Sequence, residues 1–338
     1  MRFALITADA THAKSFRINS EEGDGTSFMN WVDVWGGVQF NFERIMEQLD
    51  ILKHFDVVMM SGHLNHIVRI TEIARYLKNS DTVTMFYPEG SVQLYDNSIN
   101  GFHREYYEAW NACDVLSIAE EDKRPYYESF VTPETLVRFI HVPMRAEMES
   151  GAFLVGHGAK GRHLVVYGDN NPNHPLIAFA CAARLGVNVV AVEVGAEKVA
   201  QIQKMFPNIK ILSTTKVGQY PFLRLLGGSI VHIYPTEWFG TARQQISCAV
   251  VGTPCIGSRD SHTQQRLYPK WMGVNIYDVD ATVELARDLL GGGIYEEIAR
   301  HAFEEAVRFY GLTPTKKRFF EAVEAARAVK NKAKVAVA

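Results

Sequence analysis

Short runs of β-branched and other apolar residues alternate along the chain with longer stretches whose apolar positions follow helical spacing. This alternation is typical of βαβ units around a parallel sheet. In the first half, the pattern predicts strands at 2–7, 56–60, 82–86, 115–118 and 139–142. Between them it predicts helices at 38–54, 66–79, 101–112 and 126–130. These elements amount to one complete doubly wound half.

The alternation stops after residue 143 and restarts near residue 163. The stretch between them contains four glycines and is the predicted linker. The second half then predicts strands at 163–167, 187–192, 209–212, 230–234, 255–257 and 274–276. Its predicted helices are 175–185, 197–205, 220–226, 241–251, 281–290, 294–310 and a final helix after Pro314. We therefore expect an α/β protein with Rossmann-like domains at 1–150 and 151–312, and a C-terminal helix and tail at 313–338 that frays from residue 330.

Composition agrees with two globular domains. The chain has 338 residues, of which 47% are hydrophobic and 22% charged. Its 35 basic and 38 acidic residues are interspersed, so the sequence lacks the basic stripe of a nucleic-acid-binding protein, and nucleic acid is not an expected partner. The most apolar segment, 176–196, is interrupted by Arg184, Asn188 and Glu193. It predicts no membrane span and at most a peripheral membrane contact.

The cysteines and the N-terminal residues indicate a reducing compartment. Cys113, Cys181, Cys248 and Cys255 form no CxxC pair and have no metal-ligand spacing, so we interpret them as small buried hydrophobes. The start MRFALITADA enters a strand pattern directly and lacks the features of a signal peptide. The expected localisation is cytoplasmic.

Two segments contain glycines where a ligand could approach the backbone. Gly36 and Gly37 follow the first predicted strand and precede the predicted helix 38–54, so they would open a helix N-terminus. Taken alone, two glycines favour a tight turn, and their position after the first strand is what supports a ligand site. The second segment, IVHIYPTEWFGTAR at 230–243, combines a strand, a Pro-Thr-Glu loop and a helix start, and GTPCIG follows at 252–257.

The second segment resembles the donor site of GT-B glycosyltransferases of the family 4 type. That family's pattern is an apolar strand, Pro-Ser, Glu-Gly-Phe-Gly, a helix with a second Glu, and Gly-x-Pro. The matching residues here are Pro235, Thr236, Glu237, Phe239, Gly240, Gly252 and Pro254. Gly36-Gly37-Val38 likewise resembles the family's first-domain loop. The family's second Glu is replaced by Gln245 in this chain.

The resemblance implies two Rossmann-like domains that face a cleft and transfer a sugar from a nucleotide donor such as a UDP-sugar, with retention of configuration. It implies no metal and no other cofactor. The second domain would hold the donor and the first an unidentified acceptor. Glu237 would contact the donor sugar, the amides of Gly240 and Thr241 with Arg243 would stabilise the leaving diphosphate, and Gln245 would reach the ribose diol.

The expected phosphate site departs from the family pattern. Where the family supplies an Arg and a Lys after the first strand of the second domain, this chain has the amides Asn170 and Asn173. Backbone amides and helix N-termini can meet part of a diphosphate's need for donors. The nearest candidate cations are Arg243 and Lys216. A solvated surface position or an ion pair with Glu237 is an equally weighted interpretation of Arg243.

The first half offers candidates for the reaction itself. Glu89 follows a predicted strand in Tyr-Pro-Glu-Gly and could orient the acceptor or stabilise positive charge, although a turn Glu exposed to water fits as well. His63 competes for the catalytic role. His63 and His66 could bind a metal only with a third ligand, which the sequence does not place nearby. Tyr106, Tyr107 and Trp110 have helical spacing, which favours packing.

Three other functions remain open. A sugar-nucleotide 2-epimerase shares the architecture but needs carboxylates and a His placed for proton transfer. A degenerate member that binds only a sugar nucleotide or a partner would explain Gln245 and the amide-rich loop. A nucleic-acid-modifying glycosyltransferase would need a basic, aromatic-lined first domain. The sequence names neither the sugar, the base, the acceptor nor the oligomeric state.

Overall fold

A computed structural model of the chain describes residues 1–7, 14–15, 29–62, 64–88, 103–168, 175–215, 217–234, 236, 243–275, 277–291 and 293–337. The described residues form two units. The first contains the described residues up to Arg145 together with those from Leu312 onward, and the second contains those from Ala146 to Gly311. The chain therefore returns to its first unit through its last helix.

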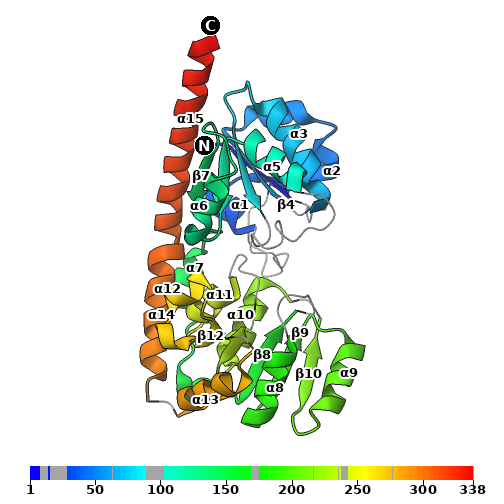
Figure 1. Ribbon diagram of the computed structural model, residues 1–338, viewed down its shortest axis with the longest axis vertical. Helices are drawn as coiled ribbons and strands as arrows, with labels where there is room; N and C mark the ends of the chain where they lie inside the picture. Colours follow the sequence, from blue (N-terminus) through cyan, green and yellow to red (C-terminus); the bar gives the residue numbers. More distant parts are fainter. Residues whose placement is uncertain are drawn as a thin grey trace. The chain divides into compact units, whose positions relative to one another are not determined.

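The first unit is built on a seven-stranded sheet in the order β2-β3-β1-β4-β5-β6-β7 (Figure 1). All neighbouring strands are parallel except β2 and β3, which are antiparallel. The carboxyl ends of the parallel strands consequently share one edge. The strands are β1 Phe3–Thr7, β2 Lys14–Ser15, β3 Val38–Asn41, β4 Val57–Gly62, β5 Val83–Pro88, β6 Val115–Ile118 and β7 Leu136–Phe139.

Helices cover both faces of this sheet because its strands are buried on both sides. One face carries a core in which Leu5, Met59 and Met85 of the strands pack with Trp31 and Phe319 from the first and last helices. Two further helices, α3 and α5, contact each other, and α3 also contacts β5 (Figure 1). The helices of the unit are α1 Met29–Trp35, α2 Phe42–Ile45, α3 Ile67–Leu77, α5 His103–Ala112, α6 Arg124–Glu128 and α15 Leu312–Val337.

The helix predicted at 38–54 is wrong. Its first residues form β3, which pairs in parallel with β1, and only α2 and a 3₁₀ turn at Leu49–His54 are helical. Val38 and Phe40 are of the β-branched and aromatic types that favour strands, whereas Phe42, Ile45 and later apolar residues suggested one continuous helix. The side chain of Asn41 accepts a hydrogen bond from the backbone N of Glu43 (2.8 Å) and starts α2 after the strand.

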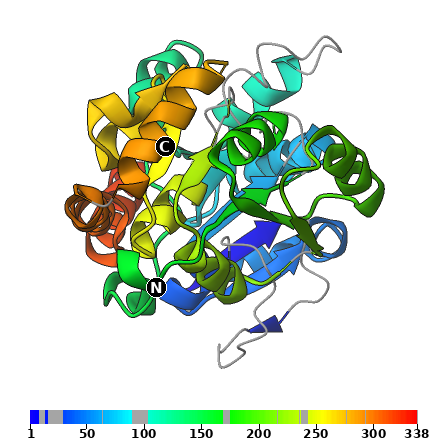
Figure 2. The same ribbon diagram turned by 90° about the horizontal axis from the view of Figure 1, so that it is seen from below.

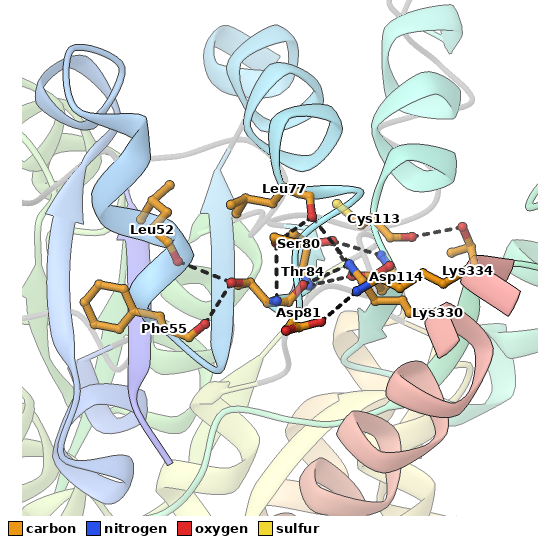
Figure 3. Close-up of polar contacts among 12 residues, drawn as sticks. Leu52, Phe55, Leu77, Ser80, Asp81, Thr84, Cys113, Asp114, Lys330 and Lys334 are labelled. Atoms are coloured by element: carbon orange, nitrogen blue, oxygen red, sulfur yellow. Dashed lines mark hydrogen bonds and ion pairs between the residues drawn. The ribbon is translucent and has the colours of Figure 1, made fainter. Parts of the chain in front are cut away.

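A buried lysine fastens α15 to the amino ends of β5 and β6 (Figure 3). The Lys330 ammonium donates to Thr82 O (2.9 Å) and Leu77 O (3.5 Å) and pairs with Asp114 Oδ2 at 3.1 Å. Asp114 also accepts from the backbone N (2.8 Å) and hydroxyl (2.9 Å) of Thr84. Lys330 is 8% exposed, and the helix continues to residue 337. The prediction that the chain frays from residue 330 is therefore wrong.

The second unit contains two three-stranded parallel sheets, β10-β9-β8 and β11-β12-β13. Hydrogen bonds connect β8 with the start of β11: Ile230 N donates to His163 O (3.1 Å) and Gly161 N to Gly228 O (2.8 Å). The combined order, β10-β9-β8-β11-β12-β13, is the 3-2-1-4-5-6 order of the Rossmann fold. The strands are β8 His163–Tyr167, β9 Asn188–Val192, β10 Ile211–Thr214, β11 His232–Tyr234, β12 Cys255–Ser258 and β13 Gly273–Val274.

The helices of the second unit divide between the two parts of its sheet. α8 contacts β8 and β9, α9 contacts β10, and α11 contacts β11 and β12. Figure 2 shows the same helices from below, with α8 and α9 in green. The helices are α7 Ala146–Glu149, α8 Pro175–Leu185, α9 Ala196–Met205, α10 Gln219–Gly228, α11 Arg243–Val250, α12 His262–Leu267, α13 Val279–Leu290 and α14 Tyr295–Tyr310.

Most predicted elements of the second half are confirmed. Helix 175–185 and strand 163–167 have the predicted bounds, and the other strands shift by up to two residues at either end. The short helix α12 was not predicted, and in the first half strand β7 begins three residues earlier than predicted, at Leu136. All four cysteines are free and buried, as predicted. None of the helices in the described part of the chain is long and apolar enough to cross a membrane.

Candidate functional site

The carboxyl edge of the second unit contains the point where the strand order reverses, between β8 and β11. In open α/β sheets ligands bind in the crevice at such a point, outside the strand ends. β8 ends at Tyr167, and Gly168 follows with φ +83°, a conformation that favours glycine. Gly168 N donates to Val192 O of β9 (2.8 Å), which holds the ends of the two strands together. The residues that follow these strands are therefore the first candidates for a ligand site.

Three half-buried polar side chains meet beside this point: Tyr167, Glu193 and Arg243. Glu193 follows β9 and hydrogen-bonds the Tyr167 phenol, while the Arg243 charge acts on that phenol from the first position of α11. Burial, followed by the charge and the hydrogen bond of Glu193, raises the pKa of Tyr167 to about 12. The phenol is therefore neutral at pH 7, and the site combines a hydroxyl, a carboxylate and a guanidinium.

Glu193 has two unusual features. Its φ is +58°, the only positive φ of a residue other than glycine in the described part of the chain. Such a conformation strains the backbone of an L residue. Its Oε1 atom is buried and has no hydrogen-bond partner among the described residues. Glu193 thus combines a strained backbone with an unsatisfied buried side-chain oxygen, and a bound ligand would explain both.

His232 lies under this edge as a structural residue. The ring is 1% exposed, with Nδ1 3.1 Å from Val165 O and Nε2 3.1 Å from Gln244 Oε1. Burial lowers the pKa of His232 to about 4, so the ring is neutral at pH 7. Because both ring nitrogens contact protein atoms, His232 connects β11 to β8 and to α11.

Gln245, expected at the ribose, lies instead in the interior of the second unit. Its side chain is completely buried: Nε2 donates to Gln264 Oε1 (3.0 Å), and Oε1 accepts from the Ser261 hydroxyl (3.3 Å). A Cβ atom on Gly257 would lie 2.9 Å from Gln245 Nε2, so the strand below has room only for glycine. This network uses both ends of the Gln245 amide and leaves no exposed side-chain surface, so the predicted contact with a ribose stays a prediction that the structure does not support.

Gly36 and Gly37 do not open a helix, contrary to the prediction. They follow the last turn of α1, and both amides donate to Val32 O (2.8 and 3.2 Å). Gly36 has φ +66°, and a Cβ atom on Gly37 would lie 2.6 Å from Phe3 O. The two glycines thus end a helix and allow close approach to β1, which gives them a structural reason. A role in donor binding stays a prediction without a helix N-terminus to support it.

Eight other predicted site residues lie outside the residues that the structure describes. Their expected roles in catalysis and donor binding stay predictions. They are His63, Glu89, Asn170, Asn173, Lys216, Glu237, Gly240 and Thr241. Of the predicted donor residues that the structure describes, Arg243 alone lies beside the switch point.

The carboxyl edge of the first unit holds a carboxyl group that the sequence did not single out. Glu120 lies two residues after β6 and is 4% exposed. Both of its carboxyl oxygens are buried and have no hydrogen-bond partner among the described residues. Burial, with a smaller contribution from Asp122, raises the pKa of Glu120 to about 8. The run Glu-Glu-Asp-Lys suggests a solvated surface, so only its place after a central strand could have drawn attention to it.

The aromatic residues of α5 mainly pack, as predicted. Tyr106 and Trp110 are 1% and 4% exposed, and Trp110 packs edge-on against Tyr127 at 5.2 Å between ring centroids. Tyr107 is 45% exposed and lies on the outside of the helix. These rings therefore belong to the framework of the first unit.

No protein-family model and no curated protein sequence matches the chain. Solved structures resemble it over almost its full length. An α-glucosyltransferase in complex with UDP and a 13-mer DNA containing an HMU base has a TM-score of 0.64 at 10% identity, over 96% of this chain and 99% of its own.

Two further structures give similar values. Anabaena Alr3699/HepE in complex with UDP and glucose has a TM-score of 0.68 at 8% identity, over 96% of this chain and 100% of its own. AviGT4, a glycosyltransferase involved in avilamycin A biosynthesis, has a TM-score of 0.62 at 15% identity, over 97% and 98%. At these identities the likeness concerns the fold. Together with the two parallel-sheet units, it shows that the chain has the two-domain α/β fold of GT-B glycosyltransferases.

Proposed function

We propose that this chain is a glycosyltransferase that moves a sugar from a nucleotide-sugar donor, a UDP-sugar first of all, to an acceptor hydroxyl, with retention of configuration. The second unit binds the donor and the first unit binds the acceptor. The observation that carries the proposal is the polar group Tyr167, Glu193 and Arg243 at the switch point of a 3-2-1-4-5-6 sheet. Two full-length structural neighbours were solved in complex with UDP, which supports the choice of base.

Arg243 has the chemistry for a leaving diphosphate. It occupies the first position of α11, where the positive end of the helix dipole disfavours a cation unless an anion lies in front of it. A guanidinium there can bind phosphate oxygens in a bidentate manner and stabilise the charge that develops as the glycosidic bond breaks. Glu237, with the amides of Gly240 and Thr241, would complete the donor contacts as the sequence predicts.

The acceptor side rests on the carboxyl edge of the first unit. Glu89 and His63 are the candidate catalytic groups there, and Glu120 adds a carboxyl group that is neutral at pH 7 and can donate a hydrogen bond to a hydroxyl. The class of acceptor is left to experiment. The α-glucosyltransferase among the structural neighbours was solved with DNA, so modified DNA belongs in the screen beside sugars.

The proposal is tested by turnover. The purified full chain is incubated with UDP-glucose, UDP-galactose and UDP-N-acetylglucosamine, each with and without a panel of glycans, small glycosides and hydroxymethylated DNA. We expect acceptor-dependent release of UDP and a glycosylated product with the donor's anomeric configuration. Epimerised UDP-sugar in the absence of acceptor would assign a 2-epimerase instead, and nucleotide binding without turnover would assign a degenerate binding protein.

A pair of arginine variants connects turnover to the site. We expect Arg243→Ala to lower kcat/KM by about 100-fold, the usual effect of removing one transition-state donor. Arg287→Ala is the matched control, because Arg287 is an exposed arginine on α13 of the same unit. Equal activity of the two variants would contradict the role of Arg243 in binding the diphosphate.

A further inference from the structure

We infer that Glu193 is the residue that recognises the ribose of the donor nucleotide, through hydrogen bonds from the ribose hydroxyls to its carboxylate. This inference rests on the proposed function and deepens it. It also assigns the task that the family resemblance gave to residue 245.

Gln245 makes its hydrogen bonds inside the second unit. Its Nε2 donates to Gln264 and its Oε1 accepts from Ser261, both inside the second unit. The side chain has no exposed surface. A ribose diol at this residue would have to replace two buried hydrogen bonds and the packing around Gly257. Recognition of the ribose therefore needs another acceptor group.

Glu193 lies at the end of the second strand of the sheet, next to the strand that precedes the expected phosphate-binding position. It directly follows β9, the strand next to β8 on the side away from the switch point, and its backbone N donates to Thr214 O at the end of β10 (3.0 Å). In a Rossmann unit, the first strand and the following helix bind the phosphates, and an acidic residue at the end of the second strand accepts hydrogen bonds from the ribose. Glu193 has the corresponding position relative to β8.

The Glu193 side chain can accept further hydrogen bonds. Tyr167 hydrogen-bonds the Glu193 carboxylate, while Oε1 is buried and has no partner among the described residues. A carboxylate oxygen accepts more than one hydrogen bond, so Oε1 can accept from hydroxyl donors. A ribose offers two adjacent hydroxyl groups, and hydrogen bonds to an ionised acceptor are about twice as strong as neutral ones. The chemistry of the vacant acceptor thus matches a diol.

The backbone of Glu193 is strained. At φ +58° a glycine or an asparagine would be less strained than a glutamate. Residues held in such conformations cluster at ligand-binding sites, where the surrounding structure maintains them. A glutamate is uncommon in this conformation where a residue only supports the fold. A task in ligand recognition explains both the residue type and its strain.

Isothermal titration calorimetry on the full chain tests the inference with UDP, 2′-deoxy-UDP, GDP and 2′-deoxy-GDP. The variants are Glu193→Gln, which keeps the shape of the side chain, and Glu193→Gly, which also relieves the backbone. Glu284→Gln is the control, an exposed glutamate on α13 of the same unit. We expect the wild type and the control to bind the preferred ribonucleotide about tenfold more tightly than its deoxy form.

In both Glu193 variants we expect this preference to disappear. The ribonucleotide should bind about tenfold more weakly and the deoxynucleotide as before, while the melting temperature of Glu193→Gly stays at or above that of the wild type. A melting temperature that falls in both variants, or a preference that survives in both, would overturn the role of Glu193 and leave the proposed function intact. Absence of nucleotide binding by the wild type would overturn the proposed function itself, and the inference with it.

Discussion

Replacing Lys330 with methionine tests how the last helix is held on the first unit. The Lys330 side chain is 8% exposed, and its ammonium group has three acceptors, Thr82 O, Leu77 O and Asp114 Oδ2 (Figure 3). Methionine fills a similar volume but cannot donate, so Asp114 would remain as a buried charge. Removing one partner of a buried ion pair costs about 3–5 kcal/mol. Asp114 keeps its two hydrogen bonds from Thr84, so we expect a loss of about 3 kcal/mol.

The assay is thermal unfolding combined with hydrogen exchange of the peptides that contain β5 and β6. For a unit of this size, about 3 kcal/mol corresponds to a fall in Tm of roughly 6–12 °C. Lys334→Met is the control, because Lys334 pairs with Asp81 at the surface, and an exposed pair contributes about 0–1 kcal/mol. Adding Asp114→Asn to Lys330→Met should recover part of the loss. Equal unfolding temperatures of Lys330→Met and Lys334→Met would contradict a stabilising role of the buried lysine.

Three further changes have expected outcomes. Because burial raises the pKa of Glu120 to about 8 in the folded protein, the free energy of unfolding should fall as pH rises from about 4.5 to about 8. Glu120→Gln should abolish this fall and add about 3 kcal/mol to the free energy of unfolding at pH 7. Urea unfolding at several pH values measures both effects. Gly37→Ala places a Cβ atom 2.6 Å from Phe3 O and should lower the free energy of unfolding by about 2 kcal/mol. Gly158→Ala is the control, because its Cβ atom meets no neighbouring atom, and it should change the same free energy by less than about 0.5 kcal/mol. Gln245→Glu introduces the family's residue, but a glutamate cannot donate to Gln264. Calorimetry should therefore show no gain in nucleotide affinity, and urea unfolding should show a loss of about 2 kcal/mol in the free energy of unfolding. Tighter nucleotide binding would contradict the buried network.

The fold could be predicted largely because strands buried on both faces are short apolar runs, and most helices have a clear apolar face. Strand 163–167 and helix 175–185 were predicted with the bounds that the structure has. Strand β3 was missed because its four residues continue directly into α2. The apolar residues of both elements together have the spacing of a single helix. The burial of Lys330 was missed for another reason. One lysine among several in an Ala- and Lys-rich helix gives no sign of the acceptors that it meets 216 to 253 residues away in sequence.

The site was harder to predict than the fold because spacing along the chain does not tell whether a polar side chain points outward. Gln245 has the spacing of a ligand residue, but Gln264 and Ser261 are brought to it by the tertiary fold. Glu193 counted in the sequence only as an interruption of an apolar segment. Its backbone conformation and its unpaired oxygen become visible only in the structure.

Titratable groups are satisfied to different extents at the two edges of the first sheet. At the amino edge, Arg2, Asp56 and Lys330 are among the residues that line a hollow of about 450 Å³. Arg2 pairs with Asp56, and Lys330 pairs with Asp114. At the carboxyl edge, Glu120 is more deeply buried than any of these groups, and neither of its oxygens has a hydrogen-bond partner among the described residues. Satisfied charges stabilise the fold, whereas an unsatisfied buried carboxyl costs stability and needs a ligand to explain it. The contrast favours the carboxyl edge as the working edge of the first unit, and Glu193 gives the same indication for the second.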